Sequence, residues 1–137
     1  MQGATLSVTA AGGERNRIAV ALSGASLRVT DTGATLRPGA GCTQSARTVS
    51  CPAAGVRDVV LDLGDGNDRG EISRSVGLRT RVRGGTGDDT LIGGSGPDEL
   101  DGGTGRDGVS YTRSPGGVLV TLGGGANDGV PGEADNV

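Results

Sequence analysis

Residues 84–110 read GGTGDDTLI-GGSGPDELD-GGTGRDGVS, which is the nine-residue pattern G-G-x-G-x-D-x-U-x, with U apolar, three times without a gap. Glycine tolerates positive φ and close backbone approach, so each unit can turn sharply and present its carbonyl oxygens. The sixth residue supplies a carboxylate and the eighth an inward apolar side chain. These residues are Asp89, Asp98 and Asp107, and Leu91, Leu100 and Val109. Three copies in phase predict a parallel β-roll whose turns bind calcium.

The three units resemble the RTX, or haemolysin-type, calcium-binding repeat family. The resemblance implies that calcium lies between turns i and i+2, held by aspartates and by backbone carbonyls. Calcium accepts about six to eight oxygen ligands in a forgiving geometry, whereas magnesium keeps its waters and demands an octahedron, so calcium is favoured. The alternative is that these are ordinary Asp-Gly turns whose aspartates cap their own backbone. That alternative fits Gly64-Asp65-Gly66, but it does not explain three contiguous units.

The spacing of the aspartates predicts a ladder on one side of the roll. In a β-roll two units make one coil, so positions about 18 residues apart stack. Asp89 and Asp107 are 18 apart, Asp68 precedes Asp89 by 21, and Asp128 follows Asp107 by 21. A loop can absorb the three extra residues. Asp98 belongs to the other side, where the residues one coil away, Thr80 and Gly116, offer no carboxylate, so an incomplete site is predicted there.

The family resemblance also assigns ligands. The best site lies between residues 84–89 and 102–107, with the carboxylates of Asp89 and Asp107. Its carbonyls come from turn residues, namely Gly85, Gly87, Gly103 and Gly105. A second site lies between Asp68 and Asp89, with Asp65 or Asn67 as additional oxygen donors. A third site, at Asp128, is less favoured because Ala126 replaces the usual glycine.

The composition argues against several other functions. The chain has 137 residues, 29 of them glycine, with one Tyr and no His, Trp or Phe. The missing histidine rules out Ser–His–Asp and Cys–His catalysis, and we expect no enzymatic activity. Arginines interleaved with aromatic residues, which would favour nucleic acid, are absent. Residues 1–60 carry six arginines and three acids, whereas residues 61–137 carry seven arginines and thirteen acids, so the repeat half is the acidic one.

The two cysteines, Cys42 and Cys51, predict a structural disulfide. Zinc would need two carboxylates as further ligands because the chain has no histidine, and a redox pair is more often spaced C-x-x-C. A disulfide closing this short loop stabilises the fold by roughly 2–3 kcal/mol and implies an oxidising, extracytoplasmic compartment. No signal peptide or membrane-spanning run is visible. Met1 precedes strand-like sequence directly, which suggests a mature fragment with an added start residue.

Period-two alternation of apolar residues predicts an all-β fold without helices. We expect a β-strand segment with a disulfide loop over residues 1–60 and calcium-binding β-roll repeats over 61–137. The first segment reads as a short β-meander, followed by a loop from about Thr32 to Pro52. Gly64-Asp65-Gly66-Asn67-Asp68 is a degenerate repeat turn, in which Gly70 takes the apolar position. The basic run 79–83 is predicted to be the solvated face of a strand.

Together these observations predict a calcium-binding β-roll module, cut from a larger secreted or cell-surface bacterial protein, with a structural or adhesive role. We expect calcium to order residues 84–110, since metal binding contributes to folding free energy. The alternatives are an accessory domain of a secreted hydrolase and a subunit of an extracellular filament. The filament alternative rests on repeat-like sequence that continues to Val137 without a visible cap. Expected partners are calcium ions, other copies of the chain or a larger parent protein, without nucleic acid or membrane insertion.

Overall fold

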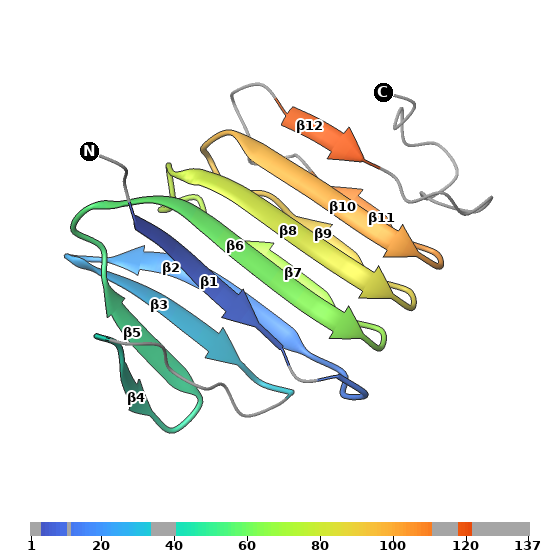
Figure 1. Cartoon of the computed structure of the whole chain (residues 1–137), viewed down its shortest axis with the longest axis horizontal. Helices are drawn as coiled ribbons and strands as arrows, with labels where there is room; N and C mark the ends of the chain where they lie inside the picture. The colour runs from blue at the N-terminus through green and yellow to red at the C-terminus, as the bar shows by residue number, and fades with distance from the viewer. Residues whose placement is uncertain (1–3, 11, 34–40, 111–117, 122–137) are drawn as a thin grey trace.

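The computed structural model describes residues 4–10, 12–33, 41–110 and 118–121, the last four through their backbone (Figure 1). Its strands are β1 (Ala4–Thr9), β2 (Arg17–Ser23), β3 (Ser26–Asp31), β4 (Thr43–Ser45), β5 (Thr48–Pro52), β6 (Val56–Asp65), β7 (Arg69–Ile72), β8 (Arg79–Thr86), β9 (Thr90–Ile92), β10 (Asp98–Thr104), β11 (Gly108–Ser110) and β12 (Val118–Thr121). Over these residues the fold is all-β, as predicted. The described residues include no helix long and apolar enough to cross a membrane.

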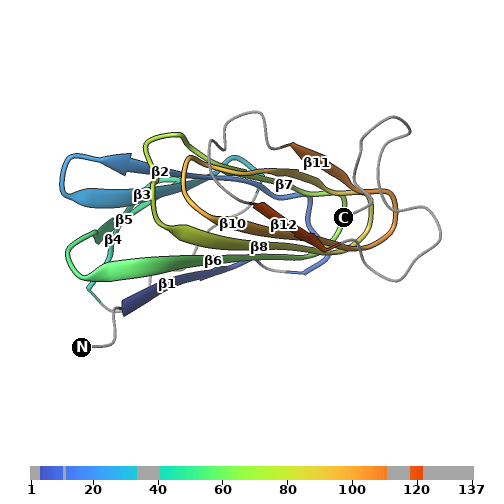
Figure 2. The same cartoon turned by 90° about the horizontal axis from the view of Figure 1, so that it is seen from above.

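The strands form two sheets that face each other as layers (Figure 2). One sheet has the order β1-β6-β8-β10-β12 and the other has the order β11-β9-β7-β2-β3-β5-β4. Every pairing in the first sheet is parallel. After β6, β8 and β10 the chain turns and crosses to the second sheet, where β7, β9 and β11 are again parallel. The predicted parallel sheet is therefore confirmed.

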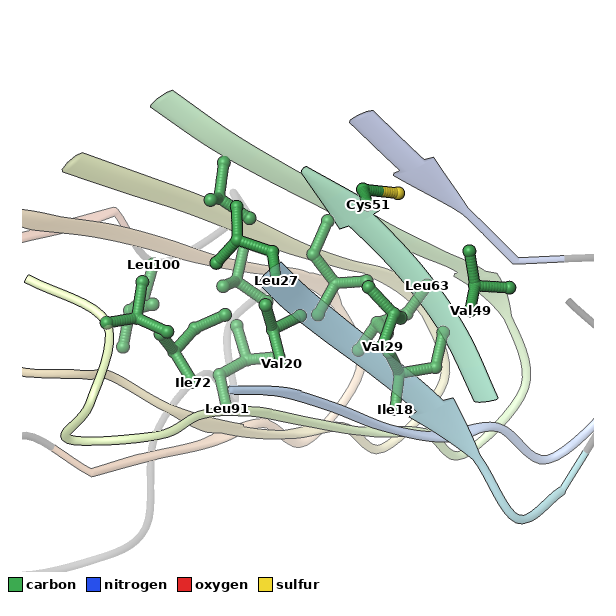
Figure 3. Packing of buried hydrophobic residues seen from close by; sticks show 14 of the residues in the cluster. Ile18, Val20, Leu27, Val29, Val49, Cys51, Leu63, Ile72, Leu91 and Leu100 are labelled. Carbon is green, nitrogen blue, oxygen red and sulfur yellow. The ribbon is translucent and has the colours of Figure 1, made fainter. Parts of the chain in front are cut away.

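The hydrophobic core lies between the two sheets and is aliphatic apart from one half-cystine (Figure 3). Its fully buried members include Ile18, Leu61, Leu91 and Leu100. Inward and outward residues alternate along the strands, as the period-two pattern predicted. Gly70 fits this core because a Cβ there would lie 3.1–3.3 Å from the side chains of neighbouring strands, which already fill the space. Those side chains are Val82, Leu63 and Leu61.

The predicted meander at the start of the chain is wrong for its first strand. β1 pairs in parallel with β6 in one sheet, while β2 lies in the other sheet between β3 and β7. The glycine-containing segment between β1 and β2 crosses between the layers instead of closing a hairpin. β1 and β2 thus connect the sheets in the same way as β6 and β7. Leu6 and Val8 of β1 pack against the core.

The disulfide between Cys42 and Cys51 is confirmed, with a Cα–Cα distance of 4.3 Å. The loop predicted from Thr32 to Pro52 is wrong in its second half, because β4 and β5 form an antiparallel hairpin there. Val49 and Cys51 of β5 point into the core, and β5 also pairs with β3. The boundary predicted at residue 60 falls inside β6, and a single hydrophobic cluster includes residues from both sides of it. The division into two parts stays a prediction.

The basic run on β8 is a solvated strand face, as predicted. Arg79, Arg81 and Arg83 are exposed, whereas Thr80 and Val82 between them are buried. Arg81 forms an ion pair with Glu99 at 2.6 Å. Such exposed pairs contribute little stability, about 0–1 kcal/mol.

Candidate metal centre

The turns that follow β6, β8 and β10 lie side by side along one edge of the molecule (Figure 1). Their second positions, Gly64, Gly85 and Gly103, are in register and have positive φ. A Cβ on Gly85 would lie 1.9 Å from the Gly64 carbonyl oxygen, and one on Gly103 would lie 2.0 Å from that of Gly85. Each carbonyl oxygen thus points at the next turn, in the space that a side chain would need. Only glycine fits this stack.

The fourth positions of the same turns repeat this arrangement. Gly66, Gly87 and Gly105 have φ of 132°, 123° and 130°. A Cβ on Gly87 would lie 1.9 Å from the Gly66 oxygen, and one on Gly105 would lie 1.9 Å from that of Gly87. The stacked turns therefore carry two rows of carbonyl oxygens that face from one turn to the next. The four glycines predicted as carbonyl donors, Gly85, Gly87, Gly103 and Gly105, all belong to these rows.

A row of aspartates lies beside the carbonyls. Asp68, Asp89 and Asp107 are 3%, 2% and 1% exposed. The Asp68 backbone N–H donates to Asp89 Oδ1 at 2.9 Å, and the Asp89 N–H donates to Asp107 Oδ1 at 3.0 Å. Each carboxylate thus reaches back to the preceding turn. The structure brings together three residues of the predicted ladder, while Asp128 lies outside the described residues.

Burial and neighbouring carboxylates disfavour the ionised forms of Asp68 and Asp89. Burial is the main cause that raises the pKa of Asp89 to about 6, and the charges of Asp107, Asp68 and Asp88 raise it further. Burial also raises the pKa of Asp68, with smaller contributions from Asp31 and Asp65. Within the described residues, Oδ2 of Asp68 and Oδ2 of Asp89 are buried without a hydrogen-bond partner. Buried carboxylate oxygens of this kind fit a cation, which would favour the charged form.

The additional oxygen donors of the predicted second site, Asp65 and Asn67, lie at the same edge. Each already accepts a hydrogen bond from a backbone N–H of an adjacent turn. Asp65 Oδ1 accepts a hydrogen bond from the Gly13 N–H at 2.7 Å, on the side away from Asp89. Asn67 Oδ1 accepts one from the Asp88 N–H at 3.0 Å. Both residues are exposed, in contrast to the buried aspartates. The ligand roles of all these residues stay predictions.

The segment between β1 and β2 contains a further turn of the stack, which the sequence analysis missed. Arg17 pairs with Arg69, so Asn16 lies beside Asp68. The Asn16 N–H donates to Asp68 Oδ1 at 2.7 Å, which continues the row of aspartates by one position. A Cβ on Gly66 would lie 2.3 Å from the Glu14 carbonyl oxygen, as between the repeat turns.

The sequence carried a weak signal for this turn. Residues 11–19 read AGGERNRIA, which places Gly12, Asn16 and Ile18 at the second, sixth and eighth positions of the repeat. Glu14 in place of the fourth glycine and Asn16 in place of the aspartate hide the match. The separation of 52 positions between Asn16 and Asp68 hides it further.

Asp98 lies on the opposite side of the coil, away from the row of aspartates. It pairs in register with Thr80, as predicted, and accepts a hydrogen bond from the Thr80 hydroxyl. On the other flank it pairs with Val118 rather than with Gly116. The connection from β10 to β12 is therefore longer than the predicted single coil, and Gly116 itself lies outside the described residues. The idea of an incomplete site here stays a prediction.

The donor set at the turns consists of oxygen atoms alone. Among the described residues, no group of three or more His, Cys, Asp or Glu side chains is placed to hold a metal ion. A cation between two turns would instead combine two aspartates with several carbonyl oxygens. Oxygen ligands of this mixed kind suit calcium. The residues present therefore fit the ion that the repeats imply.

Comparison with known protein families identifies the repeats. A family model described as "RTX calcium-binding nonapeptide repeat (4 copies)" matches residues 80–109. The match includes Asp89, Asp98 and Asp107, but neither Asp68 nor the Asn16 turn. No curated protein and no solved structure matches the chain.

Proposed function

We propose that this chain, whose residues 80–109 are RTX calcium-binding nonapeptide repeats, is a calcium-binding β-roll module. One observation supports this function above all. Asp68, Asp89 and Asp107 form a buried, in-register row beside two rows of backbone carbonyl oxygens. Calcium supplies the positive charge that this arrangement of oxygens needs in order to stay ionised and folded.

The principal site lies between the turns of β8 and β10. Asp89 and Asp107 supply the negative charge, and turn carbonyls such as those of Gly85 and Gly87 supply neutral oxygens. The glycines keep side chains out of the space between the turns. A second site lies between Asp68 and Asp89, since the same hydrogen-bond pattern links those residues.

Calcium binding in this module is coupled to folding. Without a cation the ionised aspartates of adjacent turns repel one another, and the thin aliphatic core between the sheets does not offset this repulsion, so part of the repeat stack loses order. Binding to the folded state alone stabilises that state by mass action. Extracellular calcium modules commonly bind with dissociation constants of about 10⁻⁴–10⁻³ M.

The native setting that we propose is secreted or at the cell surface. RTX repeats typically occur in secreted proteins, and the Cys42–Cys51 disulfide suits an oxidising compartment. The role is structural or adhesive within a larger parent protein and needs no catalysis, because the carboxylates of the stack are committed to metal. An accessory domain of a secreted hydrolase and a filament subunit remain the alternatives.

Calcium titration by calorimetry tests this function, with the full chain and two variants. Asp107→Asn keeps an acceptor for the Asp89 N–H but removes one charge, so we expect it to lose at least one ion. Asp101→Asn removes the same charge from the outer face of β10, where Asp101 pairs with Arg83, and should bind like the wild type. Absence of calcium binding by the wild type would sink the proposal, as would an Asp107→Asn variant that binds normally.

A further inference from the structure

The outward arginines of the first sheet are balanced by acidic residues on neighbouring strands. Opposite charges on adjacent strands stabilise a sheet, whereas like charges side by side destabilise it. Each outward arginine of β8 has an acidic partner in register. These register pairs are Arg79 with Asp58, Arg81 with Glu99, and Arg83 with Asp62. The last two pairs also form ion pairs, at 2.6 Å and 3.8 Å.

The outer face of the second sheet, the upper layer in Figure 2, departs from this rule. Arg17 of β2 lies in register with Arg69 of β7, and neighbouring strands are only about 4.8 Å apart. Arg69 has one acidic neighbour, since its Nη2 lies 3.3 Å from Glu71 Oε2. Within the residues that the structure describes, Arg17 forms no ion pair, and its carbonyl oxygen accepts from the N–H of Thr32 at 3.3 Å. Two like charges therefore lie side by side with one acid between them.

The surface beside these two arginines is hollowed. The hollow has a volume of about 320 Å³. Its lining includes Arg17, Ala19, Thr30, Thr32, Arg69 and Glu71. The small alanine and threonine side chains leave the long arginine side chains standing above the floor. Arg47 donates through Nη1 to the carbonyl oxygen of Thr32, which brings a third guanidinium group to the rim.

A second hollow continues from the same two arginines toward the turns. Its volume is about 310 Å³, and it shares Arg17 and Arg69 with the first hollow. Arg15 lines it, but so do Asp68 and Asp88, so it contains charges of both signs. The first hollow is therefore the one that favours an anion.

The donors at the first hollow suit an oxyanion on a polar ligand. A guanidinium group offers five N–H donors in a planar fork, which binds two oxygens of one anionic group. The single contact between Arg69 and Glu71 leaves donors of Arg69 for a ligand. Threonine hydroxyls donate to and accept from hydroxyl groups equally well. Protein interfaces are anchored by large aromatic or arginine side chains in apolar pockets, and the exposed large hydrophobic residue among the described ones, Leu22, lies toward the other end of β2.

We propose that Arg17 and Arg69 form a binding site for a sulfate or carboxylate group of an acidic polysaccharide. The two guanidinium groups hold the oxyanion, Arg47 adds positive charge at the rim, and Thr30 and Thr32 contact the hydroxyl groups of the sugar. The site uses none of the calcium ligands and lies outside residues 80–109. It gives the adhesive role a partner of defined chemistry.

Isothermal titration calorimetry of the full chain in calcium tests this site. The probes are a heparin hexasaccharide, with sulfate and carboxylate groups, a galacturonate hexasaccharide, with carboxylates alone, and neutral maltohexaose. We expect an acidic probe to bind, and to bind more weakly as sodium chloride is raised. Arg17→Gln and Arg69→Gln should each weaken that binding about tenfold or more. Arg79→Gln is the matched control, because it removes the same charge beside Asp58 on the first sheet, and it should bind like the wild type.

Each outcome bears on the proposal. Binding of heparin alone assigns the site to sulfate, and binding of galacturonate shows that a carboxylate suffices. Failure of both acidic probes to bind, equal binding of maltohexaose, or an equal loss in Arg79→Gln would overturn the site. If a variant fails to fold, the side-chain Nε–H NMR signals of the wild type decide. Signals of Arg17 and Arg69 that move with an acidic probe while that of Arg79 stays fixed support the site, and fixed signals of Arg17 and Arg69 overturn it.

Discussion

At the scale of single residues, glycine and aspartate have different roles in the turns. Gly87 has positive φ and leaves room for the Gly66 carbonyl oxygen, whereas Asp89 brings a carboxylate into a buried position. Neither residue is favourable on its own, because ordering a glycine costs conformational entropy and burying a charge costs desolvation free energy. Under the proposed function, their joint presence in register is what gives the turn its affinity for a cation.

The close approach at Gly87 predicts a large effect of one methyl group. Gly87→Ala would place Cβ 1.9 Å from the Gly66 oxygen, at φ 123°, and we expect it to lower the free energy of unfolding in calcium by about 2 kcal/mol or more. Gly77→Ala is the control, since its Cβ would meet only Ser95 Oγ at 3.8 Å, and it should change stability by less than about 0.5 kcal/mol. Urea unfolding measures both. Equal effects of the two variants would contradict the stacked-turn geometry.

The raised pKa of Asp89 predicts opposite pH dependences with and without calcium. A carboxyl with a folded-state pKa of about 6 binds its proton more tightly in the folded state than in the unfolded chain. In the presence of a chelator, the free energy of unfolding should therefore fall as pH rises from about 4 to about 6, and then level off. In calcium the proton competes with the ion, so affinity should drop by up to about tenfold per pH unit below 6.

Thermal melts and calcium titrations across this pH range measure the two dependences. Asp89→Asn has no carboxyl to titrate at this position, so it should show a weaker pH dependence than the wild type in both experiments. A chelated wild-type protein that gains stability between pH 4 and 6 would contradict the assigned pKa shift.

At the scale of strands and turns, the sequence predicted local features, such as strands and turn spacing, far better than it predicted which strands pair. Alternation of apolar residues correctly predicted β6 and the outward arginines of β8. The 18- and 21-residue spacings correctly aligned Asp68, Asp89 and Asp107. The same reasoning misplaced β1, because alternation shows which face of a strand is buried and not which strand lies next to it.

The two other errors have similar physical causes. The β4–β5 hairpin was taken for a loop because β4 is exposed on every residue and so lacks an alternating pattern. The sequence did not show the Asn16 turn because its partner, Asp68, follows only after the five strands β2 to β6. These strands separate the two turns in sequence but not in space. The pairing of β2 with β7 brings the two turns together in space.

At the scale of the whole molecule, the described residues combine two kinds of β-structure around one core. Parallel strands from successive coils carry the turns, and the antiparallel strands β3, β5 and β4 extend the second sheet at one end. The antiparallel end is held by a disulfide and by buried side chains such as Val49 and Leu27. The repeat end contains the buried aspartates, so we expect removal of a cation to lower stability most at that end.

Hydrogen–deuterium exchange of the full chain, with calcium and with chelator, tests this account most directly. With calcium, peptides from residues 84–110 should be protected. Without calcium the same peptides should exchange rapidly, while peptides from residues 43–52, held by the disulfide and by antiparallel pairing, should stay protected. Equal protection of residues 84–110 in calcium and in chelator would contradict the claim that calcium orders the repeat turns.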